Sequence, residues 1–223
     1  MTKSKIILIT RKLKNDSALK TWALSQGHTL VDIPFIRTIP VKGLKIPDTD
    51  WIFFSSPSVV SCYFEEYELK QKHVAALGKA TANSLAALGY QVDFVGDDEK
   101  TPTEIGRDFF TQRTINESIF FPLSNLSQRN VLTHRGNKKV IELVTYHTLS
   151  VQSTLNQKPD VIIFTSPSNV ESYFSTNKSA DSERLIAIGK TTAIALQKAG
   201  YIKISVSSTP REEDLINALQ SLE

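Results

Sequence analysis

Hydroxyl, amide and cationic side chains follow several short apolar runs of this sequence, at the point where each run ends. The largest sets are Ser55, Ser56 and Ser58 after Phe54, and Ser166, Ser168 and Asn169 after Phe164. Arg11, Lys79, Thr81, Lys190, Thr191 and Thr192 follow three further runs. These side chains donate hydrogen bonds or carry positive charge, which suits an anionic ligand such as a carboxylate.

The elements that must position these residues are predicted to be parallel strands, each followed by a helix. Ligands bind outside the carboxyl ends of such strands. The free N–H groups and the positive dipole end at the start of each following helix attract anions there. Taken singly, each serine or threonine has a second interpretation, that it only caps its helix. Taken together, in both halves of the chain, they favour a cleft between two domains that binds a polyanion.

Other catalytic and cofactor motifs are missing from the sequence. A phosphate loop needs a glycine five positions before its Gly-Lys pair, and His73 and Arg184 stand at those positions. Neither GxGxxG nor GxSxG occurs. The histidines show no metal-ligand spacing, and we expect His28, which follows a helix-stopping glycine, to face solvent. We therefore expect no metal and no nucleotide.

Composition narrows the class of protein further. The chain has 223 residues, 40% of them hydrophobic, and a formal net charge of +3. This hydrophobic content is too high for a disordered protein. No apolar run is long enough to cross a bilayer, and no secretory signal is recognisable. The scattered charges do not indicate nucleic-acid binding. Cys62 is the single cysteine, so we expect no disulfide, a reducing cytoplasmic compartment and a buried, inert thiol.

An internal repeat determines the predicted architecture. Residues 54–64 match residues 164–174 at an offset of 110, with seven of 11 pairs identical. Residues 74–90 match 185–201 at an offset of 111, with eight of 17 identical. Thr101-Pro102-Thr103-Glu104 then corresponds to Thr209-Pro210-Arg211-Glu212. Each copy alternates strand and helix, and the Thr-Pro-x-Glu sequence predicts a capped helix start in both.

Each copy needs one more strand–helix–strand unit to complete a small doubly wound, flavodoxin-like parallel sheet. Residues 6–10, 16–26 and 29–33 supply one, and residues 118–122, 127–135 and 139–143 supply the other. The simplest arrangement is an insertion. We expect residues 1–37 and 151–223 to form one α/β domain and residues 38–150 to form the inserted domain.

Two chain crossings, at about 34–41 and 145–152, would join these domains and pair as a two-stranded β-ladder. Tyr146 lies in the second crossing. Its phenol could donate a proton to a leaving group as a general acid. An equally good interpretation from sequence is that it packs the ladder.

The chain resembles the uroporphyrinogen-III synthase family. The resemblance rests on Phe164–Val170, Ile188–Ala193, Leu8–Arg11 and Val144-Thr145-Tyr146, and it spans nearly the whole chain. It implies two α/β domains joined by a β-ladder. It also implies a cofactor-free reaction, in which the linear tetrapyrrole hydroxymethylbilane, with its eight carboxylates, is closed with inversion of ring D and loss of water.

The resemblance also implies roles for individual residues. Tyr146 is the candidate acid for hydroxide loss, while Thr81, Ser166, Thr191 and Thr192 correspond to residues of the family's cleft. Lys12 and Lys190 stand where proline is common in the family, and residues 123–138 lack the usual glycine–arginine pattern. We expect a cytoplasmic monomer, because only two short crossings connect the domains, and an upstream hydroxymethylbilane synthase as a candidate partner. The alternative is a non-enzymatic two-domain protein that binds an anionic small molecule.

Overall fold

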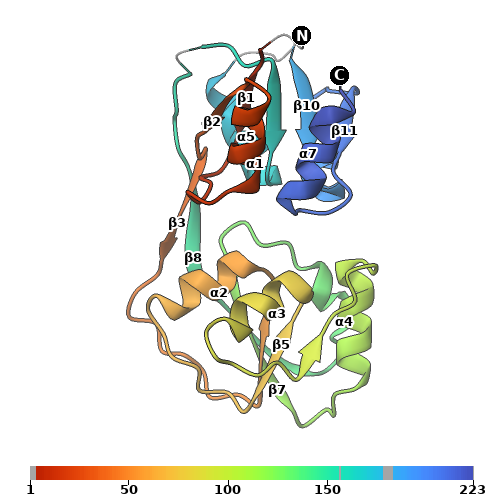
Figure 1. Cartoon of the computed structure of the whole chain (residues 1–223). Coiled ribbons are helices and arrows are strands. Elements are labelled where there is room, and N and C mark those ends of the chain that lie inside the picture. The colour runs from red at the N-terminus through yellow and green to blue at the C-terminus, as the bar shows by residue number, and fades with distance from the viewer. Residues whose placement is uncertain (1–3, 156, 178–182, 223) are drawn as a thin grey trace. The chain divides into compact units, whose positions relative to one another are not determined.

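Two sheets covered by helices, one parallel and one parallel except for its edge strand β3, make up the part of the chain that the computed structural model describes, residues 4–155, 157–177 and 183–222 (Figure 1). The chain divides into two compact units. Met1–Arg37 and Ser150–Glu223 form the discontinuous domain, and Thr38–Leu149 form the inserted domain. Each domain has its own hydrophobic core on both faces of its sheet.

The discontinuous domain has a five-stranded parallel sheet in the order β11-β10-β9-β1-β2. Its strands are β1 (Ile6–Ile9), β2 (Thr29–Asp32), β9 (Val161–Phe164), β10 (Arg184–Ala187) and β11 (Ile204–Val206). Helices α1 (Ala18–Ser25) and α7 (Glu212–Gln220) cover one face, and α5 (Pro167–Thr176) and α6 (Lys190–Lys198) cover the other.

The inserted domain has a six-stranded sheet in the order β3-β8-β7-β4-β5-β6. Its strands are β3 (Ile36–Pro40), β4 (Trp51–Phe54), β5 (His73–Ala76), β6 (Phe94–Val95), β7 (Ser118–Ser124) and β8 (Lys139–Ser150). Helices α2 (Pro57–Phe64) and α3 (Lys79–Ala86) cover one face, while α4 (Pro102–Thr111) and the 3-10 helix η1 (Asn130–His134) cover the other.

Strand and helix starts in the repeated segments follow the sequence expectation. All four residues of β4 and of β9 are buried, as apolar runs covered on both faces must be. Ser56 and Ser166 accept hydrogen bonds from the backbone N–H groups of Val59 and Asn169, and proline occupies the first helical turn in both helices. These serines are therefore helix N-caps.

The second chain crossing is part of a longer strand than predicted. β8 begins at Lys139 and continues without a break to Ser150. It pairs with β7 as far as Tyr146 and also with β3. Hydrogen bonds from Val41 N–H to the Thr145 carbonyl and from Val151 N–H to the Phe35 carbonyl, both 2.8 Å between N and O, extend that pairing as an antiparallel ladder.

The Thr-Pro-x-Glu expectation is right in one copy and wrong in the other. Thr101 and Glu104 form a reciprocal capping box at the start of α4. In contrast, α7 starts only at Glu212. The Glu212 carboxylate instead accepts hydrogen bonds from the Ser17 hydroxyl (2.7 Å) and the Leu19 N–H (3.0 Å) at the start of α1. Packing of α7 against α1 therefore overrides the local capping signal.

The expectation that His28 faces solvent is also wrong. Its side chain is buried, with 6% exposed. The ring lies edge-on to Trp22, 5.6 Å between centroids, and its Nδ1 accepts from the Lys5 N–H at 3.4 Å. The glycine before it does end the helix, but the chain then turns back towards the sheet and carries the imidazole inward.

Candidate functional site

Arg11 and a pair of threonines lie at the carboxyl ends of β1 and β9. The Thr10 hydroxyl donates to the Ile163 carbonyl and accepts from the Thr165 N–H, so this pair ties the two strands together. Arg11 has a side chain that is 38% exposed, with Nη2 4.0 Å from a Glu212 carboxylate oxygen. That distance makes a loose ion pair, which leaves the guanidinium able to bind an anion.

The start of α5 contains one buried and one accessible polar residue. Asn169 is 3% exposed, and its Oδ1 accepts from the Phe35 N–H at 3.3 Å. Its Nδ2 donates to the hydroxyls of Thr165 and Ser166. Ser166 and Asn169 therefore hold the turn together. Ser168 is half-buried, and its hydroxyl has no partner in the described part of the chain.

The start of α6 is open. Its N-cap is Gly189, which has no side chain to satisfy the helix N–H groups. A Cβ at Gly189 would have no neighbour within 4 Å. Lys190 and Thr191 are exposed, whereas Thr192 is buried with 1% exposed. Unpaired N–H groups, a hydroxyl and an ammonium group thus meet at one accessible corner, which suits a carboxylate.

In the inserted domain the corresponding serines follow β4. Ser56 is the N-cap of α2, Ser55 is half-buried and Ser58 is exposed in the first turn. Neither Ser55 nor Ser58 forms a side-chain hydrogen bond with another described residue. They are the accessible donors of this corner.

The start of α3 differs from that of α6, although their sequences match. The Lys79 N–H donates to Oδ1 of Asp98 at 3.0 Å. Thr81 is buried, with 3% exposed. The Lys79 ammonium makes no ion pair with a described carboxylate. No local sequence signal predicts this contact, because Asp98 lies 19 residues from Lys79, in the loop before α4.

Tyr146 lies on β8 with a side chain that is 5% exposed. It is opposite Ser124 in the β7–β8 register, where a β-bulge shifts the pairing. Burial raises the pKa of the phenol, and the hydroxyls of Ser124 and Ser56 act in the opposite direction. The phenol is protonated at neutral pH, as a proton donor must be, whereas its raised pKa makes it a weaker acid.

The end of β7 places a further buried hydroxyl, that of Ser124, beside Tyr146. The Ser124 N–H donates to the Ser127 hydroxyl at 2.8 Å, and the Ser124 hydroxyl accepts from the Leu126 N–H at 3.1 Å. Ser124 follows the apolar run of β7 just as Ser55 follows that of β4. The rule that picked out the other serines would therefore have identified it.

Cys62 is buried, as expected, with 1% exposed, and burial raises the pKa of its thiol. A thiol with a raised pKa is a poor nucleophile, which agrees with the predicted inert role. In the described ranges no cluster of three or more His, Cys, Asp or Glu side chains could hold a metal ion. No helix in that part of the chain is both long and apolar enough to cross a membrane.

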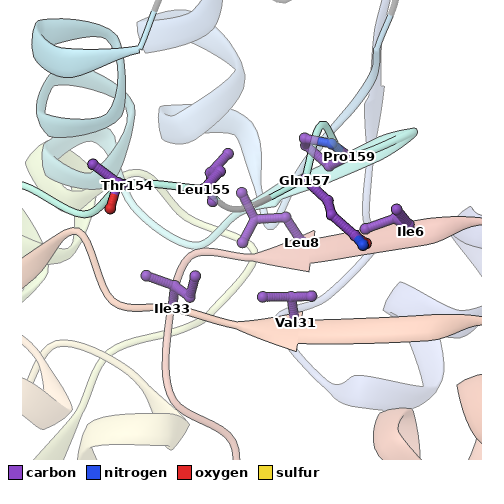
Figure 2. A pocket seen from close by; sticks show the side chains of 8 residues that line it. All are labelled: Ile6, Leu8, Val31, Ile33, Thr154, Leu155, Gln157 and Pro159. Atoms are coloured by element: carbon purple, nitrogen blue, oxygen red, sulfur yellow. The ribbon is translucent and has the colours of Figure 1, made fainter.

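A cavity of about 300 Å³ lies in the discontinuous domain, on the α5–α6 face of the sheet. Figure 2 shows Ile6, Leu8, Val31 and Ile33 on one side of it and Thr154, Leu155, Gln157 and Pro159 on the other. Six of these eight side chains are apolar and none is charged. The cavity therefore does not suit a polycarboxylate.

Comparisons with known proteins agree with this geometry. The family model described as Uroporphyrinogen-III synthase HemD matches residues 17–217. A uroporphyrinogen-III synthase of Chlorobaculum parvum (strain DSM 263 / NCIMB 8327) is 28% identical over 229 residues, covering 91% of this chain and 92% of that protein.

Two solved structures have the same fold. The crystal structure of uroporphyrinogen-III synthetase from Helicobacter pylori 26695 superposes with a TM-score of 0.71 at 18% identity, covering 99% of this chain and 100% of that one. A mutant uroporphyrinogen III synthase from the extremely thermophilic bacterium Thermus thermophilus gives a TM-score of 0.61 at 20% identity, covering 98% and 100%. These likenesses confirm the predicted α/β fold class.

Proposed function

The chain belongs to the uroporphyrinogen-III synthase family, and we propose that it closes hydroxymethylbilane to uroporphyrinogen III with inversion of ring D and loss of water. The observation that carries this proposal is the open start of α6. There, N–H groups, the Thr191 hydroxyl and the Lys190 ammonium are all accessible and unpaired within the described chain. A linear tetrapyrrole with eight carboxylates is a ligand of matching charge.

Carboxylate binding is assigned to accessible donors in both domains. In the discontinuous domain these are Arg11, Ser168, Lys190 and Thr191. In the inserted domain they are Ser55, Ser58 and the Lys79 ammonium. The remaining candidates, Ser56, Thr81, Ser166, Asn169 and Thr192, are caps or buried residues that hold those donors in place.

Tyr146 is the proposed general acid. Its protonated phenol would assist loss of the ring A hydroxyl, which gives an azafulvene. The substituted carbon of ring D then attacks to form a spiro intermediate, which fragments and closes again with ring D reversed. The protein's larger contribution is conformational, because holding the substrate folded converts ring closure into a reaction between positioned groups.

The cellular setting follows from the same proposal. We place the protein in the cytoplasm as a monomer that accepts its substrate from a hydroxymethylbilane synthase. The single cysteine supports a reducing compartment. Residues 1–37 with 151–223, and residues 38–150, are proposed as its two domains.

Product analysis tests the proposed function. The protein is incubated with hydroxymethylbilane, and the type III and type I isomers are separated. The proposal requires the type III isomer, since spontaneous closure gives type I. If only type I appears, at the uncatalysed rate, while the compound still binds, the protein is instead a two-domain binding protein for anionic small molecules.

A further inference from the structure

The carboxylate of Asp98 occupies the start of α3. Its Oδ1 accepts a hydrogen bond from the Lys79 N–H at 3.0 Å. A Cβ at Gly78 would come within 2.4 Å of that same oxygen, so the carboxylate fits against the space that glycine leaves. At Gly189, the matching position in the other copy, nothing lies within 4 Å. One copy of the repeated corner is thus filled and the other is open.

A local insertion in the first copy of the repeat places Asp98 at the start of α3. Five residues, 96–100, separate Val95 from Thr101, whereas only residues 207–208 separate Val206 from Thr209. The offset between the copies accordingly falls from 111 to 108. The longer loop is the one that contains the acidic residues of this segment.

The inserted loop is held in a defined conformation. The Gly96 N–H donates to the Ala76 carbonyl at 3.0 Å, and a Cβ at Gly96 would lie 2.1 Å from the Leu77 carbonyl oxygen. Asp97 then begins a turn. Its Oδ1 accepts a hydrogen bond from the Glu99 N–H at 3.0 Å, and its carbonyl oxygen accepts one from the Lys100 N–H at 3.0 Å. The turn directs Asp98 back onto α3.

We propose that Asp98 is a specificity-determining residue that excludes the substrate's carboxylates from the start of α3. The inference rests on the proposed function. A carboxylate tethered on the same loop has a high effective concentration at this corner, and it repels a second carboxylate. Main-chain binding of substrate carboxylates is then confined to the open corner of α6. Lys79 contributes only its ammonium group.

Acetate, the simplest carboxylate probe, tests this inference without catalysis. The backbone amide signals of Lys79, Ala80 and Thr191 are followed by NMR during an acetate titration of the full chain. Three proteins are compared: the parent, Asp98→Ala and Glu99→Ala. Glu99 is the matched control because it lies in the same loop, carries the same charge and has a side chain without a partner in the described ranges.

We expect the Lys79 and Ala80 signals to shift saturably with acetate only in Asp98→Ala. Uroporphyrinogen III, the product, should then bind Asp98→Ala about tenfold more tightly, the low end for one hydrogen bond to a charged carboxylate. Saturable shifts at Lys79 in the parent, none in Asp98→Ala, or equal shifts in Glu99→Ala would overturn the inference. A Thr191 signal that stays unchanged in all three proteins would instead contradict the proposed α6 corner.

Discussion

Tyr146 combines a structural and a proposed chemical role in one side chain. Tyr146→Phe keeps the buried ring and removes only the hydroxyl near Ser124 and Ser56. We expect formation of the type III isomer to slow by about 10²-fold or less, the low end of general-acid effects, because hydroxymethylbilane loses its hydroxyl spontaneously as well. Steady-state rates and a melting curve measured together check this.

Melting temperature and product affinity distinguish a chemical role of Tyr146 from a structural one. The melting temperature and product affinity of Tyr146→Phe should stay near those of the parent. An unchanged rate would remove the phenol from the mechanism and leave the protein as a conformational template.

Asp32, at the end of β2, makes stability depend on pH. Burial alone would raise the pKa of this carboxyl, but hydrogen bonds from the Leu13 N–H and from the Lys12 and Lys20 ammonium groups outweigh burial and lower it. A folded-state pKa below the unfolded value stabilises the fold above the unfolded pKa. That contribution disappears as pH falls through the folded pKa.

The prediction for Asp32→Asn follows from that sign. The variant should be less stable than the parent by about 1 kcal/mol at pH 7, where the parent carboxylate is charged. The difference should shrink below about pH 4, the usual aspartate pKa, and vanish in stronger acid. Urea unfolding at several pH values measures it. A difference that is constant with pH would contradict the assigned ion pairs.

At the start of helix α5, one serine has the capping role and another has the proposed binding role. Ser166 is the N-cap and also accepts from the Asn169 side chain, whereas Ser168 has no such role. Ser166→Ala should therefore lower the free energy of unfolding by about 1 kcal/mol. Ser168→Ala should change it by less than about 0.5 kcal/mol but weaken substrate binding. Chemical denaturation and KM measurements distinguish the two; reversed effects would exchange the assigned roles.

The segment that lines the cavity beside β2 differs in residue type from the matching segment of the other domain. Residues 41–50 correspond to 151–160 at the offset of 110. In the first segment Leu44 and Ile46 pack against the core of the inserted domain. Thr154 and Asn156 stand at the matching positions, the second of them outside the described residues. The matching positions therefore carry apolar side chains in the inserted domain and polar ones in the discontinuous domain.

Val31→Ile adds one methylene group on the wall of this cavity. We expect it to raise the free energy of unfolding by about 0.5–1 kcal/mol, because the added group is buried without displacing a neighbour. Val161→Ile is the matched control, since Val161 is 1% exposed in a filled part of the core and the same change should destabilise. Equal effects of the two substitutions on thermal unfolding would show that the cavity does not accept the group.

At the scale of the whole molecule, charge should control substrate affinity. The chain has a net charge of +3, and Arg11, Lys79 and Lys190 are accessible cations at strand ends. Because salt screens such pairs over about 10 Å at 0.1 M and about 3 Å at 1 M, KM for hydroxymethylbilane should rise several-fold across that range. A KM that is flat with salt, measured at constant pH, would contradict binding by these groups.

Much of the fold is predictable from local signals. Apolar runs specify β4 and β9, and Ser-Pro-Ser specifies the starts of α2 and α5, because both signals act over a few residues. The predictions that failed concern Glu212 and His28, whose positions depend on packing partners in other elements. At the site, the serines, threonines and lysines at strand ends can be identified from the sequence. Which of them are accessible cannot be read from it.

The sequence by itself determined the family, the repeat and the residues at the carboxyl ends of the strands, because residue type and spacing encode these directly. Only the tertiary structure decided that Asp98 fills the start of α3 while the start of α6 is open, and that Tyr146 is buried beside Ser124 and Ser56. These outcomes depend on side chains 19 or more residues apart meeting in space. Identical Gly-Lys sequences can therefore have opposite capacities to bind an anion.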